Sequence, residues 1–102
     1  MKYQFVLQWS ATSMDDFDTF IAVEEFLRQN LSELHDVDGH DMGCGELNIF
    51  IQTDAPKTLF SEIRGLFGME DNLATAKIAY RERRGETYVV LWPEGVEGFK
   101  VS

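Results

Sequence analysis

The chain alternates between large apolar and mostly polar residues over positions 2–9. One set of alternate positions carries four large side chains: Tyr3, Phe5, Leu7 and Trp9. Because successive side chains of a strand point to opposite faces, this pattern predicts a strand with one buried face. Residues 46–53 alternate in the same way and predict a second strand of the same kind.

Two segments show helical spacing instead. Over residues 14–31 the apolar positions recur every three or four residues, which predicts a long amphipathic helix. Ser13 followed by Asp16 has the spacing of a capping box at the start of this helix. The sequence Asp54-Ala55-Pro56 predicts a second helix of about three turns, because aspartate caps free amide groups and proline suits a first turn. Gly68 suits its end.

Three further segments have weaker strand patterns. Residues 34–41 alternate loosely before a stretch with three glycines, so they predict a short strand that enters a glycine-rich turn. Residues 74–81 and 86–92 predict two more strands, joined by a charged turn at 82–85.

The resulting order is β-α-β-β-α-β with an extra C-terminal β-strand. This order predicts an α+β fold, a two-layer ferredoxin-like plait in which two helices cover one face of an antiparallel sheet. The opposite sheet face is then expected to be open and to suit binding. At 102 residues the chain is long enough for one core. Residues 1–93 are expected to form a single domain, and residues 94–102 a C-terminal tail.

Charge narrows the classes of partner. The chain has 18 acidic and nine basic residues, a formal net charge of −9. A field of this sign repels phosphate backbones and anionic lipid, so neither nucleic acid nor a membrane is an expected partner. It attracts a basic protein.

Cysteine usage and hydropathy give the expected location. No apolar run approaches the roughly 20 residues that span a bilayer, and the first residues alternate rather than form a signal-peptide core. The single Cys44 allows no internal disulfide, and no Cys/His quartet offers a zinc site. We therefore expect a cytoplasmic protein without a cofactor.

The segment from His35 to Glu46 holds both histidines and three aspartates, and is the first place to seek a metal or a reaction. Asp36, Asp38 and Asp41 suggest a calcium loop, but the glycine comes too early for an EF-hand and no glutamate closes the loop. An exposed, charged loop accounts for the same residues more simply.

The residue pattern offers two other candidate sites. Cys44 with His40 as base could form a nucleophilic pair, although nothing in the sequence brings the two side chains together. Arg81, Arg83 and Arg84 are the one basic cluster, and the neighbouring glutamates favour a solvated turn over an anion site. The segment 45–50 lacks the basic and aromatic run of an RNA-recognition domain.

Two resemblances bear on function. The run Asp38-Gly39-His40-Asp41-Met42-Gly43-Cys44-Gly45-Glu46-Leu47-Asn48-Ile49-Phe50-Ile51 looks like a stretch of small bacterial proteins of unassigned function. In size and charge the chain is also similar to bacterial immunity proteins and antitoxins. That second resemblance implies a protein that neutralises a basic toxin by covering its active site.

The leading hypothesis is a non-enzymatic binding protein that neutralises or regulates a basic protein partner. Trp9, Phe50 or Trp92 would supply apolar anchors if exposed. The alternative is a ligand-binding or small enzymatic domain that uses the 35–46 segment beside the open sheet face. Self-association into a homodimer is a third possibility. The residues expected to contact the partner are Asp15, Asp16, Asp36, Asp38, His40, Asp41, Glu46 and Phe50.

Overall fold

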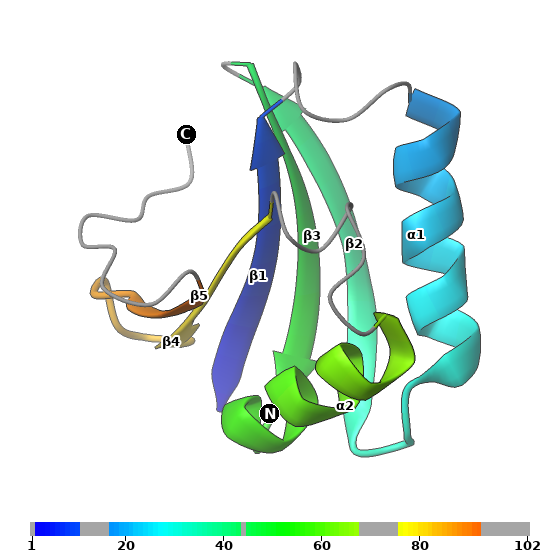
Figure 1. The fold of residues 1–102 in the computed structure, drawn as a ribbon. Coiled ribbons are helices and arrows are strands. Elements are labelled where there is room, and N and C mark those ends of the chain that lie inside the picture. Colours follow the sequence, from blue (N-terminus) through cyan, green and yellow to red (C-terminus); the bar gives the residue numbers. More distant parts are fainter. Residues whose placement is uncertain (1, 11–16, 44, 68–75, 93–102) are drawn as a thin grey trace.

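The computed structural model describes residues 2–10, 17–43, 45–67 and 76–92 (Figure 1). These residues form two helices and five strands. In chain order the elements are β1 (Tyr3–Ser10), α1 (Phe17–Asn30), β2 (His35–Gly43), β3 (Glu46–Thr53), α2 (Pro56–Phe67), β4 (Lys77–Glu82) and β5 (Val89–Trp92). The predicted capping box, the helix end at Gly68 and the tail lie outside the described residues.

The five strands form one sheet in the order β2-β3-β1-β4-β5, and every neighbouring pair is antiparallel. The α+β class and the antiparallel sheet are therefore confirmed. β1 lies at the centre, where Phe5 pairs with Ile51 of β3 and with Tyr80 of β4. Its unbroken alternation of large side chains suits a strand with a neighbour on each side.

One face of the sheet and the two helices enclose a single core (Figure 1). The sheet contributes the alternate large residues of β1 and β3, and the helices contribute residues at three- and four-residue spacings. The ring of Trp9 stands edge-on to that of Phe20 of α1, with centroids 6.1 Å apart. The buried members of this core are Phe5, Leu7, Trp9, Phe20, Val23, Leu27, Leu47, Ile49, Ile51, Leu59, Ile63, Ala76 and Ile78.

The centre of the opposite face is also buried, so the prediction of an open face is wrong there. Val6 and Ala79 are fully buried, and Gln8 and Asn48 nearly so. Gln8 Nε2 donates a hydrogen bond of 3.0 Å to Asn48 Oδ1 across the β1–β3 pair. Because a buried amide without a partner is costly, this pairing explains two polar residues on a covered face.

The second strand is longer than expected. β2 continues through Gly39 to Gly43, where the sequence predicted a glycine-rich turn. The register with β3 shifts between Val37 and Gly39, which leaves Asp38 as the extra residue of a bulge. Gly39 has a φ of 155°, which favours glycine. The glycine therefore allows a bulge within the strand, and the turn to β3 is short.

The last two strands are shorter than predicted. β5 begins at Val89 rather than at residue 86, and β4 spans Lys77–Glu82 rather than residues 74–81. The turn predicted at 82–85 is present, since the Gly85 amide donates to the Glu82 carbonyl at 2.9 Å.

The start of α2 uses a different residue from the one predicted. The hydroxyl of Thr53 accepts from the Ala55 amide at 2.9 Å, while the Asp54 carboxylate accepts from the Lys2 amide at 2.8 Å. The side chain of Asp54 therefore ties the start of β1 to the start of α2.

Candidate functional site

Three of the predicted partner-binding residues form an acidic edge on β2, which is the end strand of the sheet order. Asp36, Asp38 and Asp41 are all exposed. Asp36 and Asp41 pair with Gln52 and Asn48, so they share the sheet face that points away from the helices. Asp38 occupies the bulge. We call these three residues the acidic edge.

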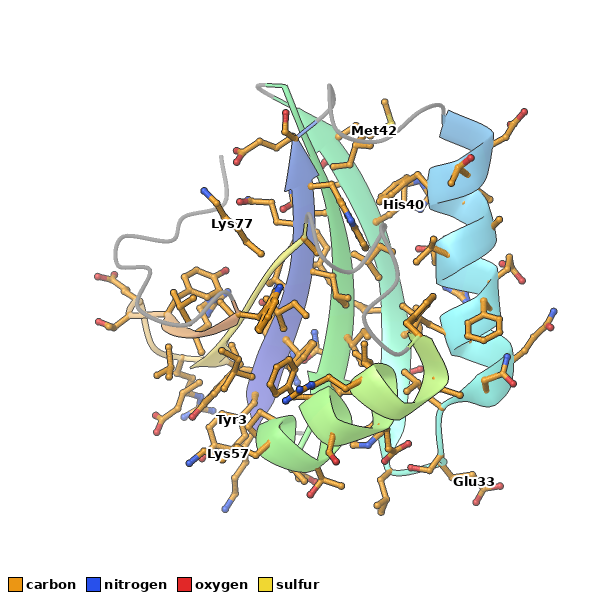
Figure 2. The ribbon with its side chains drawn as sticks, viewed as in Figure 1. Tyr3, Glu33, His40, Met42, Lys57 and Lys77 are labelled. Atoms are coloured by element: carbon orange, nitrogen blue, oxygen red, sulfur yellow. The ribbon has the colours of Figure 1, made fainter. Side chains whose placement is uncertain are left out.

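Two more predicted residues lie on the same sheet face as Asp36 and Asp41. Glu46 and Phe50 alternate with the core residues of β3 and are both half-buried. Met42, near the end of β2 (Figure 2), is 53% exposed, but it pairs with Leu47 and so lies on the opposite face, toward the helices. Met42 was not among the predicted contacts, because its exposure depends on its position at the end of the strand.

The predicted aromatic anchors are less accessible. Trp9 is 1% exposed and belongs to the core, so it cannot contact a partner. Trp92 is half-buried, and its indole nitrogen is buried without a hydrogen-bond partner among the described residues. Asp15 and Asp16 lie outside the described residues.

His40 lies on the other face of β2, toward α1 (Figure 2). Its Nδ1 is 3.1 Å from both carboxylate oxygens of Glu24, and its ring stands edge-on to Phe20. Glu24 is buried, and its carboxylate also lies 4.0 Å from the guanidinium of Arg28. His40 and Asp41 therefore point to opposite faces and do not form one constellation; Cys44 lies outside the described residues.

The backbone edge of β2 is partly obstructed. Arg28 of α1 donates a hydrogen bond of 3.5 Å to the Val37 carbonyl. The bulge at Asp38 interrupts the regular strand, and charged side chains line it. Each device is typical of edge strands that avoid pairing with another chain. A partner would therefore meet the side chains of the acidic edge rather than add a strand to it.

A second cluster, absent from the predicted site, surrounds the buried His35. Its Nδ1 is 2.7 Å from Thr53 Oγ1, and its Nε2 is 2.7 Å from Glu62 Oε2. Glu62 also accepts from the amide and the hydroxyl of Ser32. The cluster joins β2, β3 and α2. The order hydroxyl, imidazole, carboxylate is that of a hydrolase triad, but Thr53 is fully buried, so a substrate cannot reach it.

A carboxylate can only accept hydrogen bonds, so His35 Nε2 donates to Glu62. The Thr53 hydroxyl, which also accepts from the Ala55 amide, can either donate to His35 Nδ1 or accept from it. Burial raises the pKa of Glu62. The hydrogen bonds from Ser32 and His35, together with the charge of His35, lower this pKa by more, so it lies below its ordinary value.

This lowered pKa predicts a pH-dependent stability. A carboxyl with a lowered folded-state pKa stabilises the protein above its ordinary value of 4.5, and that contribution is lost as the pH falls through the folded value. We expect Glu62→Gln to be less stable than the wild type at neutral pH, with the difference shrinking below about pH 4.5. Urea unfolding over a pH series measures it. A difference that stays constant down to about pH 3 would contradict the expectation.

A group of basic residues on β4 and its turn lies on the other side of β1 from the acidic edge. The guanidinium of Arg81 in β4 donates to the carbonyls of Glu82, Arg83 and Gly85 at 3.1, 2.9 and 2.9 Å. It also donates to Gln4 Oε1 at 2.8 Å and to the Tyr88 hydroxyl at 3.3 Å. Arg81 is therefore a structural support of the turn after β4.

Among the described residues, no three His, Cys, Asp or Glu side chains are grouped so that they could hold a metal ion. Neither described helix has the length and hydrophobicity needed to cross a bilayer. Comparisons of the chain with protein-family models, with curated proteins and with solved structures find no match.

Proposed function

We propose that the chain is a non-enzymatic protein that binds a basic protein partner through the acidic edge and the adjoining face of β3. The observation that carries the proposal is the exposure of Asp36, Asp38 and Asp41 together on one end strand. Half-buried Phe50 shares the face of Asp36 and Asp41 and adds apolar surface beside them. An interface commonly combines such apolar contacts with a charged rim.

The distribution of charge supports an oriented encounter. β2 contains three aspartates and no lysine or arginine. Two strands, β3 and β1, separate it from β4. The basic residues of β4 and its turn are Lys77, Arg81, Arg83 and Arg84. A basic partner is therefore attracted to one side of the molecule and repelled from the other, and such steering raises association rates by roughly 10- to 1,000-fold at low salt.

The proposal is tested by reversing the charges of the acidic edge and measuring the affinity for the partner. Tagged protein is crosslinked in its native cells, a basic protein is identified by mass spectrometry, and the purified pair is titrated. We expect the triple variant Asp36→Lys, Asp38→Lys and Asp41→Lys to weaken binding by roughly 100-fold, because each reversal puts like charges together. Wild-type affinity should fall as salt rises, since the Debye length is only about 8 Å at physiological ionic strength.

A matched variant separates the acidic edge from net charge alone. Glu25→Lys, Glu33→Lys and Glu86→Lys reverse three exposed acids outside β2 and change the net charge by the same amount. This control should retain most of the affinity. Equal losses in the two triple variants, or the absence of any basic partner, would overturn the proposal. Light scattering of the same samples reports whether a homodimer forms instead.

We also propose that the fold is a ferredoxin-like plait and that the protein is cytoplasmic. A ferredoxin-like plait extended by β5 is supported by the central position of β1 between β3 and β4. A cytoplasmic location is supported by the single cysteine, which permits no internal disulfide. The likeness in size and charge to bacterial immunity proteins favours a partner that is a basic toxin.

A further inference from the structure

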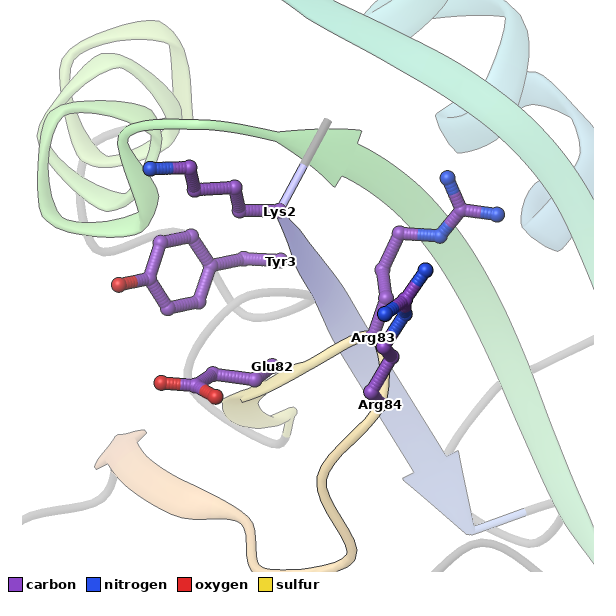
Figure 3. A pocket seen from close by; sticks show the side chains of 5 residues that line it. All are labelled: Lys2, Tyr3, Glu82, Arg83 and Arg84. Atoms are coloured by element: carbon purple, nitrogen blue, oxygen red, sulfur yellow. The ribbon is translucent and has the colours of Figure 1, made fainter.

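We infer that a cavity between the start of β1 and the turn after β4 binds the phosphate groups of a small molecule. This region is basic, whereas the acidic edge on β2 is negatively charged. A cavity of about 630 Å³ is lined there by Lys2, Tyr3, Glu82, Arg83 and Arg84 (Figure 3). We call it the basic cavity. Its size falls within the range of small-molecule sites, roughly 300–1,000 Å³. The inference concerns a different surface from the proposed partner interface and does not depend on it.

The lining of the basic cavity is unusual for this acidic chain. Of the five described residues that line it, three are cations and one is an anion. Within the part of the chain that the structure describes, none of the three cations forms a salt bridge. Arginine side chains bind phosphate oxygens through paired N–H donors, and lysine adds a point charge. Cations left without acidic partners are thus available to an anionic ligand.

The walls of the cavity are fixed by backbone contacts. The Arg83 amide donates to the Lys2 carbonyl at 2.8 Å, which joins the start of β1 to the turn after β4. Arg81 binds three carbonyls of that turn, as described above. The backbone that carries Lys2, Arg83 and Arg84 is therefore held in place before a ligand arrives. Such preorganisation lowers the entropic cost of binding.

The net charge of −9 does not prevent anion binding at this place. At physiological ionic strength charges more than about 8 Å apart are largely screened from one another. The acidic edge lies on β2, and β3 and β1 stand between it and β4. Strands are about 4.8 Å apart, so the acidic edge is roughly 14 Å from the strand that precedes the basic turn. Close to the cavity, the cations Lys2, Arg83 and Arg84 outnumber the carboxylates of Glu82, in its lining, and of Asp54, which accepts from the Lys2 amide.

The position of Glu82 indicates how a ligand is oriented. In Figure 3 the side chains of Arg83 and Arg84 extend in one direction, and those of Lys2, Tyr3 and Glu82 extend in another. Repulsion from Glu82 places a phosphate toward Arg83 and Arg84. The Glu82 carboxylate and the Tyr3 ring then border the remainder of the ligand, where a hydroxyl or amino group can donate to the carboxylate.

The experiment titrates inorganic pyrophosphate into the intact chain at constant ionic strength, followed by isothermal calorimetry and by backbone amide NMR. We expect saturable binding, with the shifted amides at Lys2, Tyr3 and residues 82–85. The double variant Arg83→Ala and Arg84→Ala should weaken binding at least about tenfold, because charge-assisted hydrogen bonds are lost. Glu82→Gln should tighten binding, since it removes the like charge.

The control removes two exposed cations outside the cavity. Lys77 lies at the other end of β4 from Glu82 (Figure 2), and Arg64 lies on α2. The double variant Lys77→Ala and Arg64→Ala changes the net charge as much as the test variant and should bind like the wild type. Absence of saturable binding in the wild type would overturn the inference. So would equal weakening in both double variants.

Discussion

Replacing His35 with alanine is expected to lower the free energy of unfolding by about 3 kcal/mol. The ring is fully buried and joins three elements through Thr53 and Glu62. Its removal leaves a cavity and takes a hydrogen-bond partner from the hydroxyl and from the carboxylate. Urea unfolding at neutral pH, followed by circular dichroism, measures the change.

His40→Ala is the matched control, because His40 also contacts a glutamate but its side chain is 36% exposed. We expect it to cost about 1 kcal/mol or less. A double-mutant cycle between His35→Ala and Glu62→Gln should show a coupling of at least about 0.5 kcal/mol. Equal losses in the two histidine variants, or no coupling, would show that the buried cluster does not stabilise the fold.

Replacing Arg81 with alanine is expected to lower the free energy of unfolding by about 2 kcal/mol. One guanidinium holds three turn carbonyls, the Gln4 side chain and the Tyr88 hydroxyl. The expected cost is below that for His35 because several of these acceptors are exposed and water can replace the lost donor. Faster hydrogen exchange of the Gly85 amide would report the loosened turn.

Two further variants test whether the loss of stability comes from the guanidinium of Arg81. Arg83→Ala removes an exposed side chain of the same turn and should change stability by less than about 0.5 kcal/mol. Arg81→Lys keeps the charge but cannot reach all five acceptors, so it should fall between alanine and the wild type. If the Arg81 and Arg83 alanine variants are equally stable, the turn does not depend on the guanidinium network.

The elements with strong periodicity were predictable from the sequence. β3 has the predicted bounds, since Leu47, Ile49 and Ile51 alternate without interruption. β1 is displaced by only one residue for the same reason. In α1, Phe20, Val23 and Leu27 are buried at the expected spacing. A repeated local pattern is sufficient to predict an element when all the apolar residues of the pattern pack into the same core.

The course of β2 was not predictable from such a pattern. The bulge at Asp38 changes the alternation partway, so Val37 and His40 share a face although they are three residues apart. Pairing with β3 decides this register, and a single strand carries no sign of it. The same shift places His40 against Glu24 and separates it from Asp41.

The basic cavity and the His35 cluster could not be predicted for a related reason, because each joins segments that are distant in the sequence. Lys2 meets Arg83 only because β1 pairs with β4, and the basic turn was therefore expected to be merely solvated. His35 finds Glu62 only when α2 packs beside the sheet. Glutamate at a helical position without an apolar role looks solvent-exposed until the neighbouring element is known.

The central place of β1 also constrains the order in which the chain can fold during synthesis. β1 leaves the ribosome first, but its two partners, β3 and β4, follow much later in the chain. Of the connections between paired strands, the one between β2 and β3 is the shortest. Short loops close fast, so this hairpin can form early. We therefore expect the hairpin to form before β1 inserts beside it, and β4 and β5 to join the sheet later, after both have been synthesised.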